Sequence, residues 1–212
     1  MTITLTVEAP VHKPTAKGAK PGFDEIVWQA WKSLELPEGY RAEIIEGAIE
    51  VSPTGSKRHS KVSYRLRKAL QAYLDSSYVV DNDMNICHEY KTFIPDCYIS
   101  REDDEDYMSD DGLSLDASAV ELVAEVVSPG WDGTTRDRQR KRRAYARAGI
   151  PVYILIDDYD LHGTVTIMTS PSPTEAVYQA AIRVPYGKEA AIPEGAAKGF
   201  VITEAITGPA RD

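Results

Sequence analysis

The sequence has only two cysteines, Cys87 and Cys97, among its 212 residues. They form neither a disulfide framework nor a CxxC pair, and the four histidines lack the spacing of a zinc site. No apolar run approaches the ~20 residues that span a bilayer. The first ten residues also lack the charged and apolar regions of a signal peptide. We therefore expect a cytoplasmic protein without a membrane segment.

Two catalytic motifs are missing as well. The sequence contains no glycine-rich phosphate loop, and no serine or cysteine lies in a nucleophile-elbow pattern. What is present is ordinary globular composition, with 42% hydrophobic and 27% charged residues. This composition argues against extensive disorder.

The net charge is −9, from 24 Lys and Arg against 33 Asp and Glu. An acidic protein repels phosphate, so this charge by itself counts against a nucleic-acid partner. The charge is unevenly distributed, however, because segments 57–68 and 136–147 hold 13 of the 24 basic residues and a single acid. The other 188 residues hold 11 basic and 32 acidic side chains. The local distribution is therefore a better guide than the total charge.

The first half of the chain shows helix and hairpin patterns. Residues 1–22, rich in Pro, Lys and Ala, are predicted to be a flexible arm with a short extended piece at 3–7. Apolar spacing predicts helices over 24–34 and 60–74, and the segment between them, 40–53, is typical of a hairpin. Strand-like segments at 78–90 and 92–99 precede an acidic loop at 102–111.

The second half contains the most apolar segments. Residues 119–128, AVELVAEVVS, are typical of a strand buried on both faces. Thr134 or Thr135 is expected to cap a basic helix that ends at Ala148. A second central strand at 152–158 and a terminal β-meander follow. This order of elements predicts an α/β fold with a mixed β-sheet flanked by helices. Residues 23–206 are expected to form one domain, which adds an N-terminal helix and a C-terminal β-meander to that sheet.

Two acids in apolar strands are candidate metal ligands. Glu125 lies inside the run 119–128, where an unpaired carboxylate would cost several kcal/mol. Asp96 follows Pro95 in the apolar segment TFIPDCYI. Two such acids at adjacent strand ends would form an oxygen-rich site of the kind that Mg²⁺ or Mn²⁺ prefers. The alternatives are that Glu125 pairs with a basic residue and that Asp96 is a solvated edge residue.

Other candidates come from helices and turns. Asp137, Lys141 and Tyr145 are spaced by four and predict one helical stripe. Lys141 could orient a water or hold a phosphate oxygen, or it could be one of several solvated charges. Alternation places Glu43 on the same strand face as Ile45, whereas Glu46 favours a solvent-facing turn. His59 could be a ligand, although a lone histidine at a helix start is more often a surface residue.

Five segments in order resemble the Uma-type endonuclease family of the PD-(D/E)XK nuclease superfamily. They are YRAEIIEGAIEVSP, RHSKVSYRLRKAL, IPDCYIS, LVAEVVSP and DRQRKRRAYARAGIPVYILID, within about residues 24–160. The resemblance implies the restriction-endonuclease-like fold, with Pro95-Asp96 as the PD element and Glu125 as the acid of the (D/E)XK element. The lysine of that element would fall at Val127, but Lys141 matches the position that such families use on the following helix. Glu43 matches the early glutamate of the family, and His59 matches its helix-start histidine.

The resemblance implies a metal-dependent endonuclease that hydrolyses phosphodiester bonds of nucleic acid, with DNA as the expected substrate. Asp96 and Glu125 would bind Mg²⁺ or Mn²⁺, and Lys141 and Glu43 would complete the catalytic set. Lys57, Arg58, His59, Arg138 and Arg142 are expected to contact the nucleic acid. Nucleases of this fold are often homodimers, and the terminal strands could supply an interface.

Two alternatives remain open from the sequence. The chain could be a catalytically inactive module that keeps the nuclease fold and binds nucleic acid, which Val127 in place of the motif lysine would also fit. It could instead be a protein-interaction domain in which the basic helix binds an acidic partner.

Overall fold

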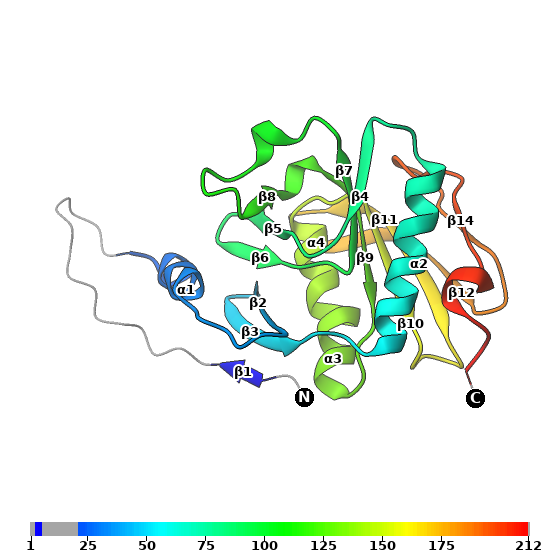
Figure 1. Cartoon of the computed structure of the whole chain (residues 1–212), viewed down its shortest axis with the longest axis horizontal. Coiled ribbons are helices and arrows are strands. Elements are labelled where there is room, and N and C mark those ends of the chain that lie inside the picture. Colours follow the sequence, from blue (N-terminus) through cyan, green and yellow to red (C-terminus); the bar gives the residue numbers. More distant parts are fainter. Residues whose placement is uncertain (1–2, 6–20, 212) are drawn as a thin grey trace.

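The computed structural model describes residues 3–5 and 21–211, and Figure 1 shows their arrangement. Two six-stranded sheets form the body, with strand orders β1-β3-β2-β6-β5-β8 and β12-β11-β10-β9-β7-β4. The first sheet consists of β1 (Ile3–Leu5), β3 (Ala48–Pro53), β2 (Tyr40–Ile45), β6 (Lys91–Phe93), β5 (Asn85–His88) and β8 (Ser114–Asp116). The second consists of β12 (Val177–Pro185), β11 (Thr164–Ser172), β10 (Val152–Asp157), β9 (Val120–Val126), β7 (Cys97–Arg101) and β4 (Tyr78–Asp81). A two-stranded ribbon, β13 (Ala190–Ala191) with β14 (Val201–Ile202), lies near the C-terminus.

The helices are α1 (Phe23–Lys32), α2 (Lys57–Tyr73), α3 (Trp131–Thr135), α4 (Arg142–Arg147) and α5 (Glu204–Thr207). Short 3₁₀ turns occupy Glu105–Tyr107 and Ala117–Ala119, and a π-helical segment, Arg136–Lys141, joins α3 to α4. None of the helices in the described part of the chain is long and apolar enough to cross a membrane.

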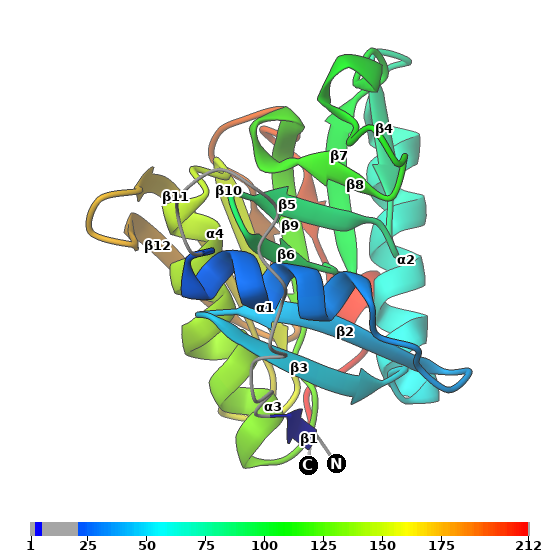
Figure 2. The same ribbon diagram turned by 90° about the vertical axis from the view of Figure 1, so that its left-hand side faces the viewer.

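The parallel pair β9 and β10 forms the centre of the second sheet, because both strands are apolar along nearly their whole length. On one face, Leu122 and Ala124 pack with Leu66 and Leu70 of α2. On the other face, Val123 packs in a cluster with Tyr145 of α4. Figures 1 and 2 show α2 and α4 on opposite sides of this sheet. Glu125 has the parity of Val123, so the strand directs it towards the basic helix.

The N-terminal helix covers the first sheet. Val27 packs against Ala42 and Ile44 of β2, and the Trp31 indole Nε1 donates to the Ala42 carbonyl at 2.9 Å. Figure 2 shows α1 lying across β2 and β3. Because Ala42 and Ile44 face α1, the alternate residues of β2, including Glu43 and Ile45, face the centre of the molecule.

The α/β class with a mixed sheet flanked by helices is confirmed, and the strands divide between two sheets. The predicted extended piece at 3–7 corresponds to β1, whereas residues 6–20 of the predicted arm lie outside the described residues. The second helix begins at Lys57 rather than at residue 60, because the Ser56 hydroxyl accepts from His59 N at 3.3 Å and caps it.

The predicted cap of the basic helix is wrong. The helical segment begins at Trp131, and Thr134 and Thr135 lie inside it. The Thr134 hydroxyl donates back to the carbonyls of Gly130 and Trp131 instead of accepting from the backbone. The helix therefore starts immediately after Pro129-Gly130, the turn between β9 and α3.

Leu66 should carry much of the packing of α2 on the second sheet, because it is fully buried in the core cluster. We expect Leu66→Ala to lower the free energy of unfolding by about 2–5 kcal/mol, measured by urea denaturation. Lys68→Ala, at an exposed position of the same helix, should change it by less than about 0.5 kcal/mol. Equal effects would show that α2 does not pack as described.

Candidate active site

Asp96, immediately before β7, lies across from Glu125 of the neighbouring strand β9. The antiparallel register pairs Cys97 with Ala124, and one step further it brings Asp96 opposite Glu125. Both side chains are almost fully buried, with residue exposures of 5% and 1%. The backbone N–H of Val126 donates to Asp96 Oδ2 at 2.8 Å, so the β9 backbone itself orients the aspartate. The alternative of a solvated edge residue is wrong for Asp96.

Lys141 lies at the centre of the site. Its ammonium Nζ is 2.8 Å from Glu125 Oε1 and 2.8 Å from Glu43 Oε1, and its side chain has no exposed area. A third contact, at 3.4 Å, reaches the carbonyl of Ile94. The alternative that Lys141 is a solvated surface charge is therefore wrong. The lysine joins β9 of one sheet to β2 of the other.

Glu43 is the inward-facing acid of β2. Besides Lys141, its Oε1 accepts from the backbone N–H of Ile94 at 2.7 Å, so the end of β6 also holds it. Glu46 is the exposed turn residue that the sequence indicates, with a positive φ of 52°, and it pairs with Arg140 and Arg143.

The predicted stripe of Asp137, Lys141 and Tyr145 faces inward, and all three residues are buried. The Tyr145 hydroxyl donates to Glu125 Oε1, and the Tyr153 hydroxyl donates to the Asp137 carbonyl at 2.8 Å. The helix is π-helical between Arg136 and Lys141. Such wider turns are often found at functional sites.

The pKa values of the buried acids in this cluster depend on burial and on the nearby cations. Burial, opposed by Lys141, raises the pKa of Glu125 to about 8. Burial also acts on Glu43, but Lys141 and Arg41 outweigh it and lower the pKa of Glu43. For Lys141, the two glutamates outweigh burial and raise the pKa. Burial therefore opposes the ionisation of Glu125 more than that of Glu43, and Lys141 offsets this effect only in part for Glu125.

Asp96 is held by two side chains that face the solvent side of the site. His59 Nε2 lies 2.9 Å from Asp96 Oδ2, and Arg41 Nη2 lies 3.4 Å from Asp96 Oδ1. These partners outweigh burial and keep the pKa of Asp96 well below its usual value. His59 is largely enclosed, so the interpretation of it as a surface residue is wrong. Gly55 leaves room for its ring, since a Cβ there would lie 2.4 Å from His59 Nδ1.

The residues expected to contact nucleic acid fall into two groups. Arg58 makes an ion pair with Asp158 and donates to the Thr207 carbonyl at 2.9 Å. Arg138 binds Asp157 through two hydrogen bonds of 2.6 and 3.1 Å. Lys57 and Arg142 are exposed, without an ion pair among the described residues. The guanidinium groups of Arg58 and Arg138 are thus already occupied by acids at the end of β10.

A cleft of about 310 Å³ opens beside this cluster, at the carboxyl ends of β9 and β10. Its walls include Arg41, His59 and Arg136, together with the segment 126–129 and Tyr159. The side chains of Asp96, Glu125 and Lys141 lie behind this wall. Sequence reasoning missed Arg41 and Arg136, because neither is one of the residues that the resemblance assigns a role and both belong to segments with many charges.

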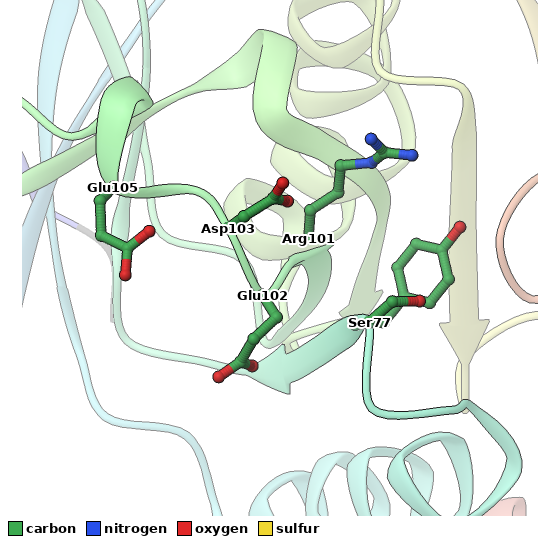
Figure 3. Close-up of a pocket in the computed structure, with 6 residues that line it drawn as sticks. Ser77, Arg101, Glu102, Asp103 and Glu105 are labelled. Carbon is green, nitrogen blue, oxygen red and sulfur yellow. The ribbon is translucent and has the colours of Figure 1, made fainter.

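A second pocket, of about 470 Å³, lies at the acidic loop and contains none of these residues. Figure 3 shows its carboxylates, from Glu102, Asp103 and Glu105, pointing in different directions. In the described ranges, no three His, Cys, Asp or Glu side chains are arranged to hold a metal ion. Asp96 and Glu125 supply two carboxylates, and this donor set fits a Mg²⁺ ion, which commonly takes one or two carboxylates and keeps several waters.

Comparisons with known proteins identify a family and a similar fold. Residues 28–204 match the model of the Uma2 family, described as "Putative restriction endonuclease". A crystal structure titled as a putative nuclease belonging to DUF820, from Anabaena variabilis, superimposes with a TM-score of 0.60 at 16% identity. The match covers 79% of this chain and 88% of that one. No curated protein sequence matches the chain.

Removing the buried ammonium should leave two carboxylates enclosed without their cation. We expect Lys141→Met to lower the free energy of unfolding by about 3–5 kcal/mol at neutral pH, measured by chemical denaturation. The triple change Glu43→Gln, Glu125→Gln, Lys141→Met should recover a large part of this loss, because it leaves no charge unpaired. The neighbouring Arg142→Ala, at an exposed position, is the control. If Lys141→Met costs no more than Arg142→Ala, the buried ion pairs do not form.

Proposed function

Because the chain belongs to the Uma2 family, whose model covers residues 28–204, we propose that it is a metal-dependent endonuclease. The reaction is hydrolysis of phosphodiester bonds in nucleic acid, with DNA as the proposed substrate. Asp96, Glu125, Lys141 and Glu43 form the catalytic set.

One observation supports this proposal most strongly. Two carboxylates from adjacent strands, Asp96 and Glu125, lie with the Lys141 ammonium directly behind a cleft whose wall carries guanidinium groups. Charged side chains are seldom buried unless they are paired or functional. A purely structural arrangement needs one acid for one base, whereas here Lys141 has two glutamates within 2.8 Å. One ammonium shared by two glutamates supports the presence of a further cation beside them.

Mg²⁺ or Mn²⁺ is the proposed cofactor, with Asp96 and Glu125 as its protein ligands and the Val126 carbonyl as a third oxygen. When bound, such an ion would polarise the phosphate and lower the pKa of a water. Lys141 supplies a positive charge and a hydrogen-bond donor beside Glu125, where negative charge develops on the phosphoryl oxygens. Glu43 positions that ammonium through its 2.8 Å contact.

The proposed nucleic-acid contacts use positive charge around the cleft. Lys57 and Arg142, which are exposed, would bind the backbone without reading sequence. His59, Arg58 and Arg138 would act closer to the cleft, in addition to the acids that they already bind. Cytoplasmic location and the division into an arm, 1–22, and a domain, 23–206, stay predictions.

A homodimer is also proposed, through the edge of the second sheet. β12 is an edge strand of nine residues, most of them exposed, including Ile182 at 44%. Long exposed edges readily pair with another strand. Light scattering should give twice the chain mass, and Ile182→Lys should shift the protein towards the monomer. A monomer at all concentrations would contradict this part of the proposal.

One observation favours a second candidate, a nuclease-fold module that binds nucleic acid without cutting it. Lys141 and Glu125 are 0% and 1% exposed, and the lysine contacts both glutamates rather than the cleft. Binding by such a module would not depend on Glu125.

Glu125→Gln should abolish Mg²⁺- or Mn²⁺-dependent cleavage of plasmid DNA, because it removes a proposed metal ligand and the partner of Lys141. Glu121→Gln, on the same strand but partly exposed, should cut like the wild type. Chelation by EDTA should stop the reaction, and Mn²⁺ binding by calorimetry should be lost in Asp96→Asn. Wild-type protein that binds DNA but cuts no nucleic acid in either metal would favour the non-cleaving module instead.

A further inference from the structure

The wall of the cleft carries two arginines that the catalytic set does not include. Arg41 comes from β2, and Arg136 is the first residue of the π-helical segment after α3. Both line the same cleft although they come from different layers of the fold. Neither Lys141 nor Glu125 lines it. A ligand entering the cleft would therefore meet these guanidinium groups before it reaches the buried acids.

Arg41 has hydrogen-bonding capacity that the protein does not use. A guanidinium group has five N–H donors, and the ion pair of Arg41 is a single 3.4 Å contact with Asp96 Oδ1. Its Nε is buried and has no hydrogen-bond partner among the described residues. By contrast, Arg138 donates two hydrogen bonds to Asp157. An unpaired buried donor is costly, so the Arg41 guanidinium, which lines the cleft, keeps donors that the described residues do not use.

Arg136 is held rigidly along one edge. Its Nε donates to Asp137 Oδ1 at 2.8 Å, and its Nη2 donates to the Ser128 hydroxyl at 3.3 Å. Asp137 Oδ2 also accepts from the backbone N–H of Ser128 at 3.0 Å. The contacts of Arg136 in the described residues use Nε and Nη2, so the guanidinium is oriented while Nη1 is available for a ligand.

Two like charges converge on this cleft. Burial works against the charge of each arginine, but neighbouring carboxylates raise both pKa values, so both groups stay protonated. The positive charge of Arg136 is close enough to Arg41 to oppose its protonation. Two neighbouring cations that keep unused N–H donors are typical of an anion site. The planar guanidinium group can also donate two parallel hydrogen bonds to two oxygens of one phosphate.

We propose that Arg41 and Arg136 form a phosphate-binding pair that takes a phosphodiester group of the nucleic-acid strand in front of Asp96. This inference rests on the proposed function, and it adds the residues that first bind the phosphate backbone of the nucleic acid. The phosphate oxygens accept from the guanidinium group of Arg41, which lines the cleft, and from the free edge of Arg136. Asp137 and Ser128 position Arg136 and do not touch the ligand.

The test is fluorescence anisotropy with a fluorescein-labelled DNA duplex in EDTA buffer, which separates binding from cleavage. We expect Arg41→Gln and Arg136→Gln each to weaken binding about tenfold or more. Each should also reduce the slope of log K against log salt by about 0.9 for one lost phosphate contact. Arg41→Lys should keep the salt slope but bind more weakly, because it keeps the charge and loses the planar group. Arg147→Gln is the control, since Arg147 is exposed at the last turn of α4.

Thermal melting checks that each variant folds. If Arg136→Gln does not fold because Asp137 is left unpaired, the double change Arg136→Gln, Asp137→Asn replaces it. If Arg41→Gln and the Arg136 variant bind DNA with the affinity and salt slope of the wild type, the two arginines are not a phosphate-binding pair. The proposed function would stand in that case.

Inorganic phosphate distinguishes the two failures further. Titrated phosphate should shift the NMR signal of the Arg41 Nε–H group, and Arg136→Gln should weaken this binding. A protein that binds no nucleic acid but shows this phosphate response contradicts the proposed function and keeps the anion site. A protein that binds neither nucleic acid nor phosphate overturns both.

Discussion

The burial of the Glu125 carboxylate is the constraint on which the rest of the site depends. The residue lies in a strand that packs on both faces, so its charge must be met by groups brought to it. The Lys141 ammonium and the Tyr145 hydroxyl meet it from the helix, and Glu43 meets the same ammonium from the other sheet. One buried carboxylate thus joins β9, the basic helix and β2. The position of the cleft follows from this junction, because the cleft forms where these elements end.

The basic segment 136–147 is largely neutralised inside the protein. Its ion pairs link Arg136 to Asp137, Arg138 to Asp157, Arg140 to Glu46 and Glu50, Lys141 to Glu43 and Glu125, and Arg143 to Glu46. Within the described residues, Arg142 and Arg147 alone of this segment have no ion pair. In this segment, most of the basic side chains seen in the sequence therefore pair with acids of the protein itself. In the proposed complex, a few arginines on the cleft wall, rather than the segment as a whole, would bind the phosphate.

Much of this arrangement could be predicted from sequence. Glu125 stands out because a single acid interrupts an apolar run, and the four-residue spacing of Asp137, Lys141 and Tyr145 predicts a shared face. Arg41 and Arg136 could not be found in this way. Arg41 is one charge at the start of a hairpin strand, and the burial of Arg136 depends on a π-helical turn that has no periodic signal. The false cap at Thr134 has a similar cause, because threonine hydroxyls also bond to the preceding turn.

Asp96 connects the two parts of the site, since it belongs to the carboxylate pair and also contacts the cleft wall. Its Oδ2 accepts from Val126 N and lies beside His59, whereas its Oδ1 has the longer, 3.4 Å contact with Arg41. The strong bonds fix the position of the aspartate, and the weak one holds Arg41 loosely. If a phosphodiester binds the Arg41 guanidinium as proposed, it would weaken the contact with Asp96 Oδ1 and leave the aspartate held through Oδ2. Binding of the phosphate would then be coupled to the loss of one contact of Asp96, so that the cleft wall and the carboxylate pair would respond to the same ligand.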